Sequence, residues 1–361
     1  MQRNITAAIC GAGNIAKSHA IILRELGIPI LLVVDINEER AKAFAEQYGI
    51  ADYSTREEDL YQSKADCVHV CTPANLHYDM VKKLLEKDYH VFCEKPLCFD
   101  DEEAKTLYQL AKEKNRLHAV GFNVRFHKAV QEARKLVANP EFGRVNLIHG
   151  SYLQEYHVFP APYDWRYNEK LAGRMRAVTE IGSHWTDLAQ FITGKGITAV
   201  SALFSNFVPT RALQDGMMYP PGSRAGSETV TIHSEDAALI HLQFEDGAVG
   251  SVVLSEVSAG RINHLSIEIA GQNQSVWWNS EENNRLNVAS KNQGVNTSVF
   301  PFGGGFRDTL RGLFAAFYKD IERGYAEEHP TYPTLYDGMR NVFICNAIYE
   351  SATNSGKWIS I

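Results

Sequence analysis

Residues 7–16 read AAICGAGNIA, and this stretch decides the fold. The apolar run at residues 7–10 has the length of a short strand, and residues 15–26 repeat apolar positions at helical spacing. Gly11 and Gly13 therefore lie in a turn between a strand and a helix. Glycines there let the backbone approach a pyrophosphate, and the NH groups at the helix amino terminus attract its charge. The stretch predicts a dinucleotide-binding turn; a plain structural turn is the alternative.

A carboxylate follows the next apolar run, residues 29–34, about 20 residues beyond the glycines. Asp35 can accept hydrogen bonds from both hydroxyls of an adenine ribose, and it repels a ribose 2′-phosphate. NAD is therefore favoured over NADP as the cofactor, although the nearby Arg40 weakens this preference. The alternative is that Asp35 only caps the turn before Glu38. The neighbours that we expect to contact the dinucleotide are Asn14, Ile15 and Ile36.

Short apolar runs alternate with helical patterns over the first 121 residues. Further runs at residues 67–71, 90–93 and 118–120 are separated by helical patterns at residues 76–87 and 101–114. Strands without polar alternation, separated by helices, are typical of a parallel sheet covered on both faces. We predict a doubly wound Rossmann domain over residues 1–121, within an α/β fold class.

After residue 121 the segments become longer and alternate between apolar and polar residues, which predicts a different domain over residues 122–361. Its expected strands are residues 145–156, 198–208, 228–233, 237–244, 248–257 and 265–270. Its expected helices are residues 127–137, 179–192, 307–323 and 334–351. The Asp-Gly pair at residues 246–247 favours a tight hairpin, and residues 209–226 are expected to form a long loop. We predict an α+β domain with a large, mostly antiparallel open sheet.

The helices of this second domain can cover only one face of its sheet. The other face is therefore either solvated or buried against another subunit. We expect a homo-oligomer, a dimer or a tetramer, that forms through this sheet.

Composition limits the class of protein. A length of 361 residues favours two domains, and a net charge of -7 without a basic cluster argues against nucleic-acid binding. No apolar run approaches the roughly 18 residues that span a bilayer, and the first residues do not resemble a signal peptide. The six cysteines lack metal-type spacing and are expected to be reduced, so we predict a cytoplasmic protein without a membrane partner.

Two further motifs follow predicted strands of the parallel sheet. These are CTPANLH at residues 71–77 and CEKP at residues 93–96, at the sheet edge where doubly wound folds bind ligands. With these motifs the sequence resembles the Gfo/Idh/MocA oxidoreductase family over almost the whole chain. The resemblance implies that Lys95 is catalytic and that its bond to Pro96 is often cis. It also implies cofactor contacts from Thr72, Pro73, Asn75, His77, Glu94 and Lys95.

A third motif, EIGSHWTD at residues 180–187, resembles the family's usual D-x-G-x-H-x-x-D. The resemblance makes His184 the second catalytic residue and Glu180 a substrate-binding or proton-relaying carboxylate. Glu in place of Asp lengthens the side chain by one methylene, which leaves the exact role of Glu180 open. The resemblance further implies cofactor contacts from Asn123, Trp165 and Arg166, and substrate contacts from Lys95, Arg125, Tyr156, Glu180 and His184.

These residue types suit hydride transfer from a carbinol carbon. The hydroxyl proton must leave, so a base has to lie within about 3 Å of that oxygen. Desolvation and a positive nicotinamide ring favour neutral Lys95, and His184 can share a proton near neutral pH. On an α-helix Glu180, His184 and Asp187 would share one face, although a solvated polar face has the same spacing. The sequence has no H-E-x-x-H and no zinc-type spacing, so we predict no catalytic metal.

The predicted activity is that of an NAD(P)-dependent oxidoreductase acting on a carbinol or carbonyl carbon of a sugar, cyclitol or glycoside. Two alternatives remain. One is a glycoside-cleaving enzyme that oxidises its substrate transiently and then eliminates. The other is a dinucleotide-binding regulator without catalysis, against which the presence of Lys95 and His184 argues. The sequence does not specify the substrate, the direction, the face of hydride transfer or the number of subunits.

Overall fold

The computed structural model describes residues 5–361 except residues 225 and 302–303. The described chain divides into two compact units. Unit 1 consists of residues 1–126 and 305–342, and unit 2 consists of residues 127–304 and 343–361. Each unit is described by itself below.

The parallel sheet of unit 1 is built, in its described part, from six strands in the order β3-β2-β1-β4-β5-β6. The strands are β1 (Ala7–Cys10), β2 (Ile30–Val34), β3 (Asp52–Ser54), β4 (Cys67–Val70), β5 (His90–Cys93) and β6 (His118–Val120). Every neighbouring pair runs parallel. This order belongs to doubly wound dinucleotide-binding folds, so the predicted Rossmann sheet is confirmed.

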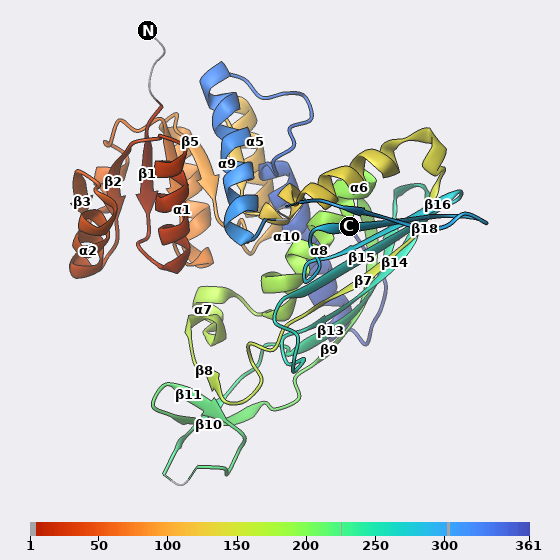
Figure 1. The fold of residues 1–361 in the computed structure, drawn as a ribbon. Coiled ribbons are helices and arrows are strands. Elements are labelled where there is room, and N and C mark those ends of the chain that lie inside the picture. The colour runs from red at the N-terminus through yellow and green to blue at the C-terminus, as the bar shows by residue number, and fades with distance from the viewer. Residues whose placement is uncertain (1–4, 225, 302–303) are drawn as a thin grey trace. The chain divides into compact units, whose positions relative to one another are not determined.

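Helices with local start and stop signals cover this sheet (Figure 1). They are α1 (Asn14–Glu25), α2 (Glu38–Tyr48), α3 (Glu57–Leu60), α4 (His77–Glu86), α5 (Asp101–Lys114) and α9 (Phe306–Arg323), with the 3-10 turns η1 (Ala74–Leu76) and η2 (Asn123–Phe126). The Asn37 side chain caps α2 by accepting from the Arg40 NH, and Asp100 caps α5 in the same way. Caps of this kind satisfy NH groups that the first helical turn leaves without partners.

The segment 305–342 packs with unit 1, whereas the sequence analysis assigned it to the second domain. The apolar face of α9, with Leu313, Phe314 and Phe317, belongs to the same buried core as Ile9 and Phe92 of the parallel sheet. Helical spacing shows that α9 has an apolar face, but it does not show which sheet that face covers. Helix α10 (Leu335–Thr353) begins within this segment and ends in unit 2.

Unit 2 contains a large open sheet with the described strand order β18-β17-β16-β15-β7-β14-β13-β9-β19. The strands are β7 (Val145–Leu153), β9 (Ile197–Ser205), β13 (Ala237–Phe244), β14 (Val249–Ser255), β15 (His264–Gly271), β16 (Gln274–Asn279), β17 (Arg285–Ser290), β18 (Gly294–Val299) and β19 (Ile359–Ser360). Among these pairs β7 and β14 run parallel and the others run antiparallel. The mostly antiparallel sheet is confirmed, and β16 to β18 extend it beyond the strands that the sequence predicted.

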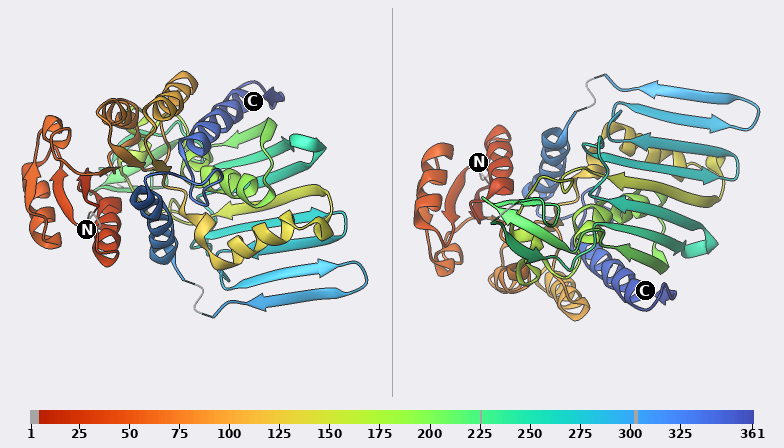
Figure 2. Two further views of the ribbon diagram at one scale, coloured as in Figure 1. Left: turned by 90° about the horizontal axis from the view of Figure 1, so that it is seen from above. Right: turned by 90° about the horizontal axis from the view of Figure 1, so that it is seen from below.

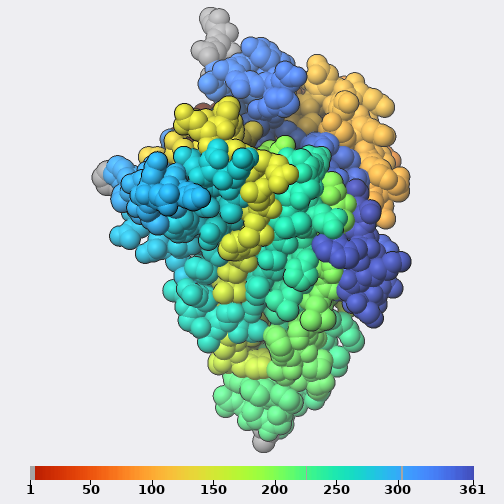
Figure 3. All heavy atoms as spheres, turned by 90° about the vertical axis from the view of Figure 1, so that its right-hand side faces the viewer, coloured from red at the N-terminus to blue at the C-terminus, as the bar shows by residue number. Residues whose placement is uncertain are grey.

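Among the residues that the structure describes, helices cover one face of this sheet and none covers the other (Figure 2). The covering elements include α6 (Lys128–Ala138), α8 (Ser183–Thr193), the π-helical turn η5 (Val178–Gly182) that precedes α8, and the short turn η3 (Pro140–Phe142). The turn η6 (Glu245–Gly247) connects β13 to β14. Figure 3 shows the uncovered face, on which strand β7, in yellow, runs between blue-green strands. The remaining elements of this region are η4 (Trp165–Tyr167) and α7 (Glu169–Ala172).

A smaller sheet has the described order β12-β10-β11-β8. Its strands are β8 (Ala161–Pro162), β10 (Thr210–Gln214), β11 (Met217–Tyr219) and β12 (Glu228–Thr231). The prediction of a long loop over residues 209–226 is therefore wrong, because β10 and β11 pair as a hairpin around Asp215 and Gly216. The predicted strand at residues 228–233 pairs with this hairpin, not with the large sheet. Within the described residues, no helix is both long and apolar enough to cross a membrane.

Candidate active site

The glycine turn after β1 has the geometry of a phosphate cradle. Gly11 has a φ of +91°, and a Cβ there would lie 2.6 Å from the carbonyl oxygen of Cys71. A Cβ at Gly13 would meet no described atom within 4 Å, so space is open above the turn. Helix α1 starts at Asn14, and no described side chain caps its first NH groups. Free NH groups next to open space suit a pyrophosphate.

Asp35 fixes this turn from the end of β2. Its Oδ2 accepts the Ala12 NH at 2.9 Å and its Oδ1 accepts the Asn37 NH at 2.9 Å. Arg40 lies 3.6 Å from the same carboxylate. Asp35 thus has the turn-capping contact that the sequence left as an alternative, and each oxygen keeps a lone pair for a ribose hydroxyl. Ile36, beside it, is 92% exposed.

His77 ties together the loops that follow β4 and β5. Its buried ring lies 2.7 Å from the carbonyl oxygen of Pro96 through Nδ1 and 2.9 Å from that of Thr72 through Nε2. Burial lowers the pKa of His77, although the two carbonyl groups act in the opposite direction. The Lys95–Pro96 bond is cis. His77 is therefore a link between the two predicted cofactor loops. Thr72 and Pro73 are half-buried beside it, and Asn75 is exposed.

Glu94 is held between two donors directly before Lys95. Its Oε1 lies 2.9 Å from His19 Nε2, and its Oε2 accepts the backbone NH of Lys95 at 3.3 Å. A Cβ at Gly121 would lie 2.6 Å from Oε2, so the absence of a side chain there makes room for the carboxylate. The half-buried Lys95 thus follows a fixed, buried carboxylate at the carboxyl edge of the sheet.

The structure gives the buried Asn123 and Arg125 partners that the sequence did not predict. Asn123 Nδ2 donates to Thr309 Oγ1 at 2.6 Å, and the Arg125 guanidinium pairs with Asp337 at 2.6 Å. Both partners come from segment 305–342. The contacts join η2 to that segment within unit 1, and the predicted cofactor and substrate roles of the two residues stay predictions.

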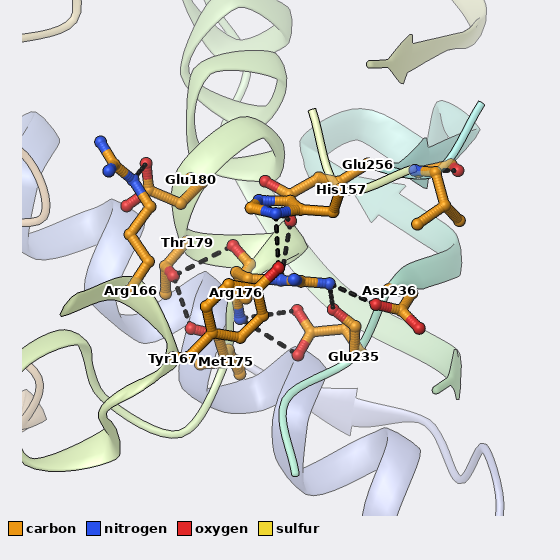
Figure 4. Close-up of polar contacts among 12 residues, drawn as sticks. His157, Arg166, Tyr167, Met175, Arg176, Thr179, Glu180, Glu235, Asp236 and Glu256 are labelled. Carbon is orange, nitrogen blue, oxygen red and sulfur yellow. Dashed lines mark hydrogen bonds and ion pairs between the residues drawn. The ribbon is translucent and has the colours of Figure 1, made fainter. Parts of the chain in front are cut away.

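Glu180 and His184 come from unit 2 (Figure 4 shows Glu180). Glu180 lies on η5 and His184 on the first turn of α8, and both are half-buried. The sequence predicted a regular α-helix here, but its start is π-helical. Asp187 is buried at 3% exposure, so it does not share the surroundings of the other two. The Arg166 Nε lies 3.3 Å from Glu180 Oε2, and Arg166 also pairs with Asp164 at 2.9 Å. Two further predicted site residues, Trp165 and Tyr156, are exposed.

A buried ionic cluster, formed by Arg176, Arg211, Glu235, Asp236 and Glu256, supports this segment (Figure 4). The Arg176 guanidinium pairs with Asp236 at 2.5 Å and with Glu256 at 2.9 Å. Glu235 accepts the backbone NH groups of Arg176 and Val178, which caps the start of η5. The cluster therefore fixes the backbone that carries Glu180.

His157 lies beside this cluster as a neutral ring. Burial lowers the pKa of His157 to about 3, and the positive charges of Arg176 and Arg211 act in the same direction. Its Nδ1 lies at hydrogen-bond distance, 2.5 Å, from the Tyr167 hydroxyl. The sequence analysis missed the ionic cluster, although charged residues next to the apolar strands at residues 237–244 and 249–255 are a signal for buried ion pairs.

Metal binding finds no support in the geometry. Across the residues that the structure describes, no group of three or more His, Cys, Asp or Glu side chains could hold a metal ion. The absence of a catalytic metal stays a prediction.

A parallel sheet of this order, with a glycine turn after β1 and a carboxylate after β2, defines a dinucleotide-binding Rossmann protein. Residues 5–122 match a family model described as an oxidoreductase family with an NAD-binding Rossmann fold. Residues 130–277 match the C-terminal domain of the same GFO/IDH/MocA family. The chain belongs to the Gfo/Idh/MocA family of oxidoreductases. The predictions of this family and of NAD binding are confirmed.

Relatives of known activity match over most of their length. Levoglucosan dehydrogenase of Pseudarthrobacter phenanthrenivorans is 28% identical, and the match covers 99% of this chain and 98% of that protein. A solved structure of levoglucosan dehydrogenase with NADH and L-sorbose has a TM-score of 0.90 at 27% identity, with 99% of both chains covered. The scyllo-inositol 2-dehydrogenase (NAD⁺) of Bacillus subtilis is 25% identical over 83% of this chain and 81% of its own.

Proposed function

We propose that this protein is an NAD-dependent dehydrogenase that oxidises a secondary hydroxyl of a sugar, cyclitol or glycoside. The observation that carries the proposal is the common edge of one parallel sheet, where the glycine turn follows β1, Asp35 follows β2 and Lys95 comes shortly after β5. The whole-length match to levoglucosan dehydrogenase supports a sugar-like substrate. The bound NAD supplies the hydride acceptor.

The chain's own residues handle the hydroxyl proton. Lys95 takes this proton as the hydride leaves and returns it in the reverse direction. His184 shares the proton near neutral pH, because an imidazole titrates in that range. Glu180 binds substrate hydroxyls, and its contact with Arg166 orients the carboxylate. This account requires Lys95 and His184 to meet at one substrate hydroxyl.

Asp35 selects NAD over NADP in this proposal. The carboxylate is 8% exposed and already accepts two backbone NH groups, so it stays where a 2′-phosphate would have to lie. Like charges at this distance repel. Arg40 reduces this repulsion without removing it, because its own side chain is 55% exposed and screened by water.

The uncovered face of the large sheet supports a homo-oligomer. Leu203, Leu239 and Val253 lie opposite one another across β9, β13 and β14, and all three are exposed. A contiguous aliphatic row of this kind marks an interface more often than a solvated surface. Leu239→Glu should convert the assembly to a monomer in sedimentation, whereas an unchanged sedimentation coefficient would contradict this interface.

We also propose a cytoplasmic location, which the six buried free thiols support.

The activity test follows NADH absorbance with levoglucosan, scyllo-inositol, myo-inositol and methyl glucosides, with NAD⁺ and NADP⁺ in turn. We expect NADH formation with at least one of these substrates and a preference for NAD⁺.

Lys95→Ala and His184→Ala should each lower kcat about 100-fold or more, as expected for loss of a proton-transfer group. The exposed Lys135→Ala and His329→Ala are the matched controls. NADH formation that survives Lys95→Ala would contradict the proposal. Cleavage of a chromogenic glycoside without net NADH would instead support the elimination mechanism.

A further inference from the structure

A chain of hydrogen bonds crosses the apolar core of unit 1 and ends on Glu94. His19 Nε2 lies 2.9 Å from Glu94 Oε1, and His19 Nδ1 lies 2.8 Å from His69 Nδ1. His69 Nε2 then lies 2.8 Å from the Tyr318 hydroxyl. The four side chains come from α1, β4, the end of β5 and α9. They are brought together only by the fold of unit 1.

The surroundings of this chain are aromatic and dry. His19 and His69 are completely buried, and Tyr318 is 6% exposed. The His69 ring stacks on Phe92 at 4.9 Å between centroids, and Phe314 packs edge-on against both imidazoles. Polar groups in such a place are tolerated only when each has a hydrogen-bond partner. Apolar packing alone therefore does not explain why these polar side chains lie in the core.

The direction of the chain follows from its carboxylate end. An ionised carboxylate only accepts, so His19 Nε2 must donate to Glu94, and His19 Nδ1 is then bare. His69 Nδ1 must donate to that bare nitrogen, which leaves His69 Nε2 to accept from Tyr318. All three donors thus point toward Glu94. The Cys71 thiol lies 3.3 Å from the same His19 Nδ1, which places a second donor on the nitrogen that this assignment leaves bare.

Other titratable groups around the chain remain neutral. Burial raises the pKa values of Cys67, Cys71 and Cys93, and it raises that of Tyr318. Burial lowers the pKa of His69 well below its ordinary value, and the neighbouring His19 acts in the same direction. Asp66 lies beyond Tyr318 at the other end of the chain, where its carboxylate accepts from Thr6.

We propose that His19, His69 and Tyr318 are positioning residues that hold the Glu94 carboxylate in a fixed orientation directly behind Lys95. Each hydrogen bond polarises the next, so the donor that reaches Glu94 is stronger than an isolated imidazole. The fixed carboxylate in turn holds the backbone NH of Lys95. This inference rests on the proposed role of Lys95, but it concerns a different set of atoms and can fail separately.

A spectroscopic test needs no substrate. Protein labelled with ¹⁵N-histidine, bound to NADH, is examined at pH 7.5, and the two rings are assigned with His19→Gln and His69→Asn. We expect a neutral His19 with its proton on Nε2 and a neutral His69 with its proton on Nδ1. A doubly protonated ring, or a His69 proton on Nε2, would overturn the directed chain.

The kinetic test compares two buried tyrosines of the same core. Tyr318→Phe removes the first donor of the chain, whereas Tyr332→Phe removes a hydroxyl that donates to Asp320. With the substrate found in the activity panel, Tyr318→Phe should lower kcat about threefold to tenfold, the effect of one hydrogen bond, and leave KM within twofold. Tyr332→Phe should change neither.

A second pair of variants separates the hydrogen bond from the packing. His69→Asn keeps a donor at the Nδ1 position toward His19, so it should retain more activity than His69→Leu, which keeps none. Equal kcat values for Tyr318→Phe and Tyr332→Phe would overturn the positioning role, even if Lys95→Ala is inactive. If Lys95→Ala instead keeps its activity, the proposed function is wrong. The ¹⁵N measurement on His19 and His69 would still test the direction of the hydrogen bonds.

Discussion

The two units support their candidate residues in different ways. Unit 1 holds Glu94 and Lys95 through close backbone approach and a row of neutral hydrogen-bonding rings. Unit 2 holds Glu180 with a buried ionic cluster around Arg176. A neutral row fixes the direction of donors at little electrostatic cost, whereas buried charges must balance one another. A substitution in the hydrogen-bonded row of unit 1 should therefore lower activity more than stability. A substitution in the ionic cluster of unit 2 should lower stability more than activity.

The largest effect is expected from Arg176→Met. This change leaves Asp236 and Glu256 buried without that cation, which should lower the free energy of unfolding by about 3–5 kcal/mol. Chemical denaturation measures the loss. The control is Arg285→Met, whose side chain is 55% exposed and pairs only at the surface. A loss at Arg176 no greater than that at Arg285 would show that the ionic cluster is not what stabilises unit 2.

Gly11→Ala tests whether a substitution in unit 1 lowers function, here cofactor binding, more than stability. The new Cβ would lie 2.6 Å from a backbone oxygen, so the turn must move and the dissociation constant for NADH should rise about 100-fold, or about 2.7 kcal/mol. Gly27→Ala is the matched control, because its φ of +71° carries similar strain but a Cβ there meets no described atom within 4 Å. Titration of NADH fluorescence distinguishes the two. Equal binding by both variants would remove the steric argument for a phosphate cradle.

Glu235 of the ionic cluster should make the stability of unit 2 depend on pH. Burial raises the pKa of Glu235 to about 6 from an ordinary value of 4.5. A raised pKa means that the folded state binds the proton more tightly, so this group's contribution is fully present below pH 4.5. It is lost as the pH rises from 4.5 through 6. The lost contribution should reach about 2 kcal/mol, at 1.36 kcal/mol for each pKa unit.

Glu235→Gln isolates this effect from His157, whose lowered pKa makes stability change with the opposite sign. Unfolding free energies of the two proteins are compared between pH 4.5 and 6.5. We expect the wild-type protein to lose stability relative to Glu235→Gln across this interval. A constant difference between them would mean that Glu235 does not titrate in that range.

The sequence predicted the parts of the fold that local patterns determine. Most strands and helices of residues 7–120, the glycine turn and the carboxylate at Asp35 follow from short-range spacing, and the structure has them. The short elements β3 and α3 were not predicted. Residues 210–219 carry an Asp-Gly pair at their centre, so the β10–β11 hairpin had a signal that the high Gly and Pro content around it obscured.

What the sequence could not predict depends on distant partners. His69 and Tyr318 are 249 positions apart, and Glu235 and Val178 are 57 positions apart. Periodicity identifies a buried helix face on α9 but not the sheet that it covers. The π-helical start of the segment that carries Glu180 likewise depends on Glu235, which accepts the NH groups at its beginning.

The central claim is that Lys95 and His184 act on one hydroxyl group. The most direct measurement is a crystal structure of the protein with NADH and the substrate identified in the activity panel. The account predicts Lys95 Nζ and an imidazole nitrogen of His184 within about 3 Å of the same substrate oxygen. A structure in which the two side chains face different cavities, or in which the substrate touches neither, would contradict it.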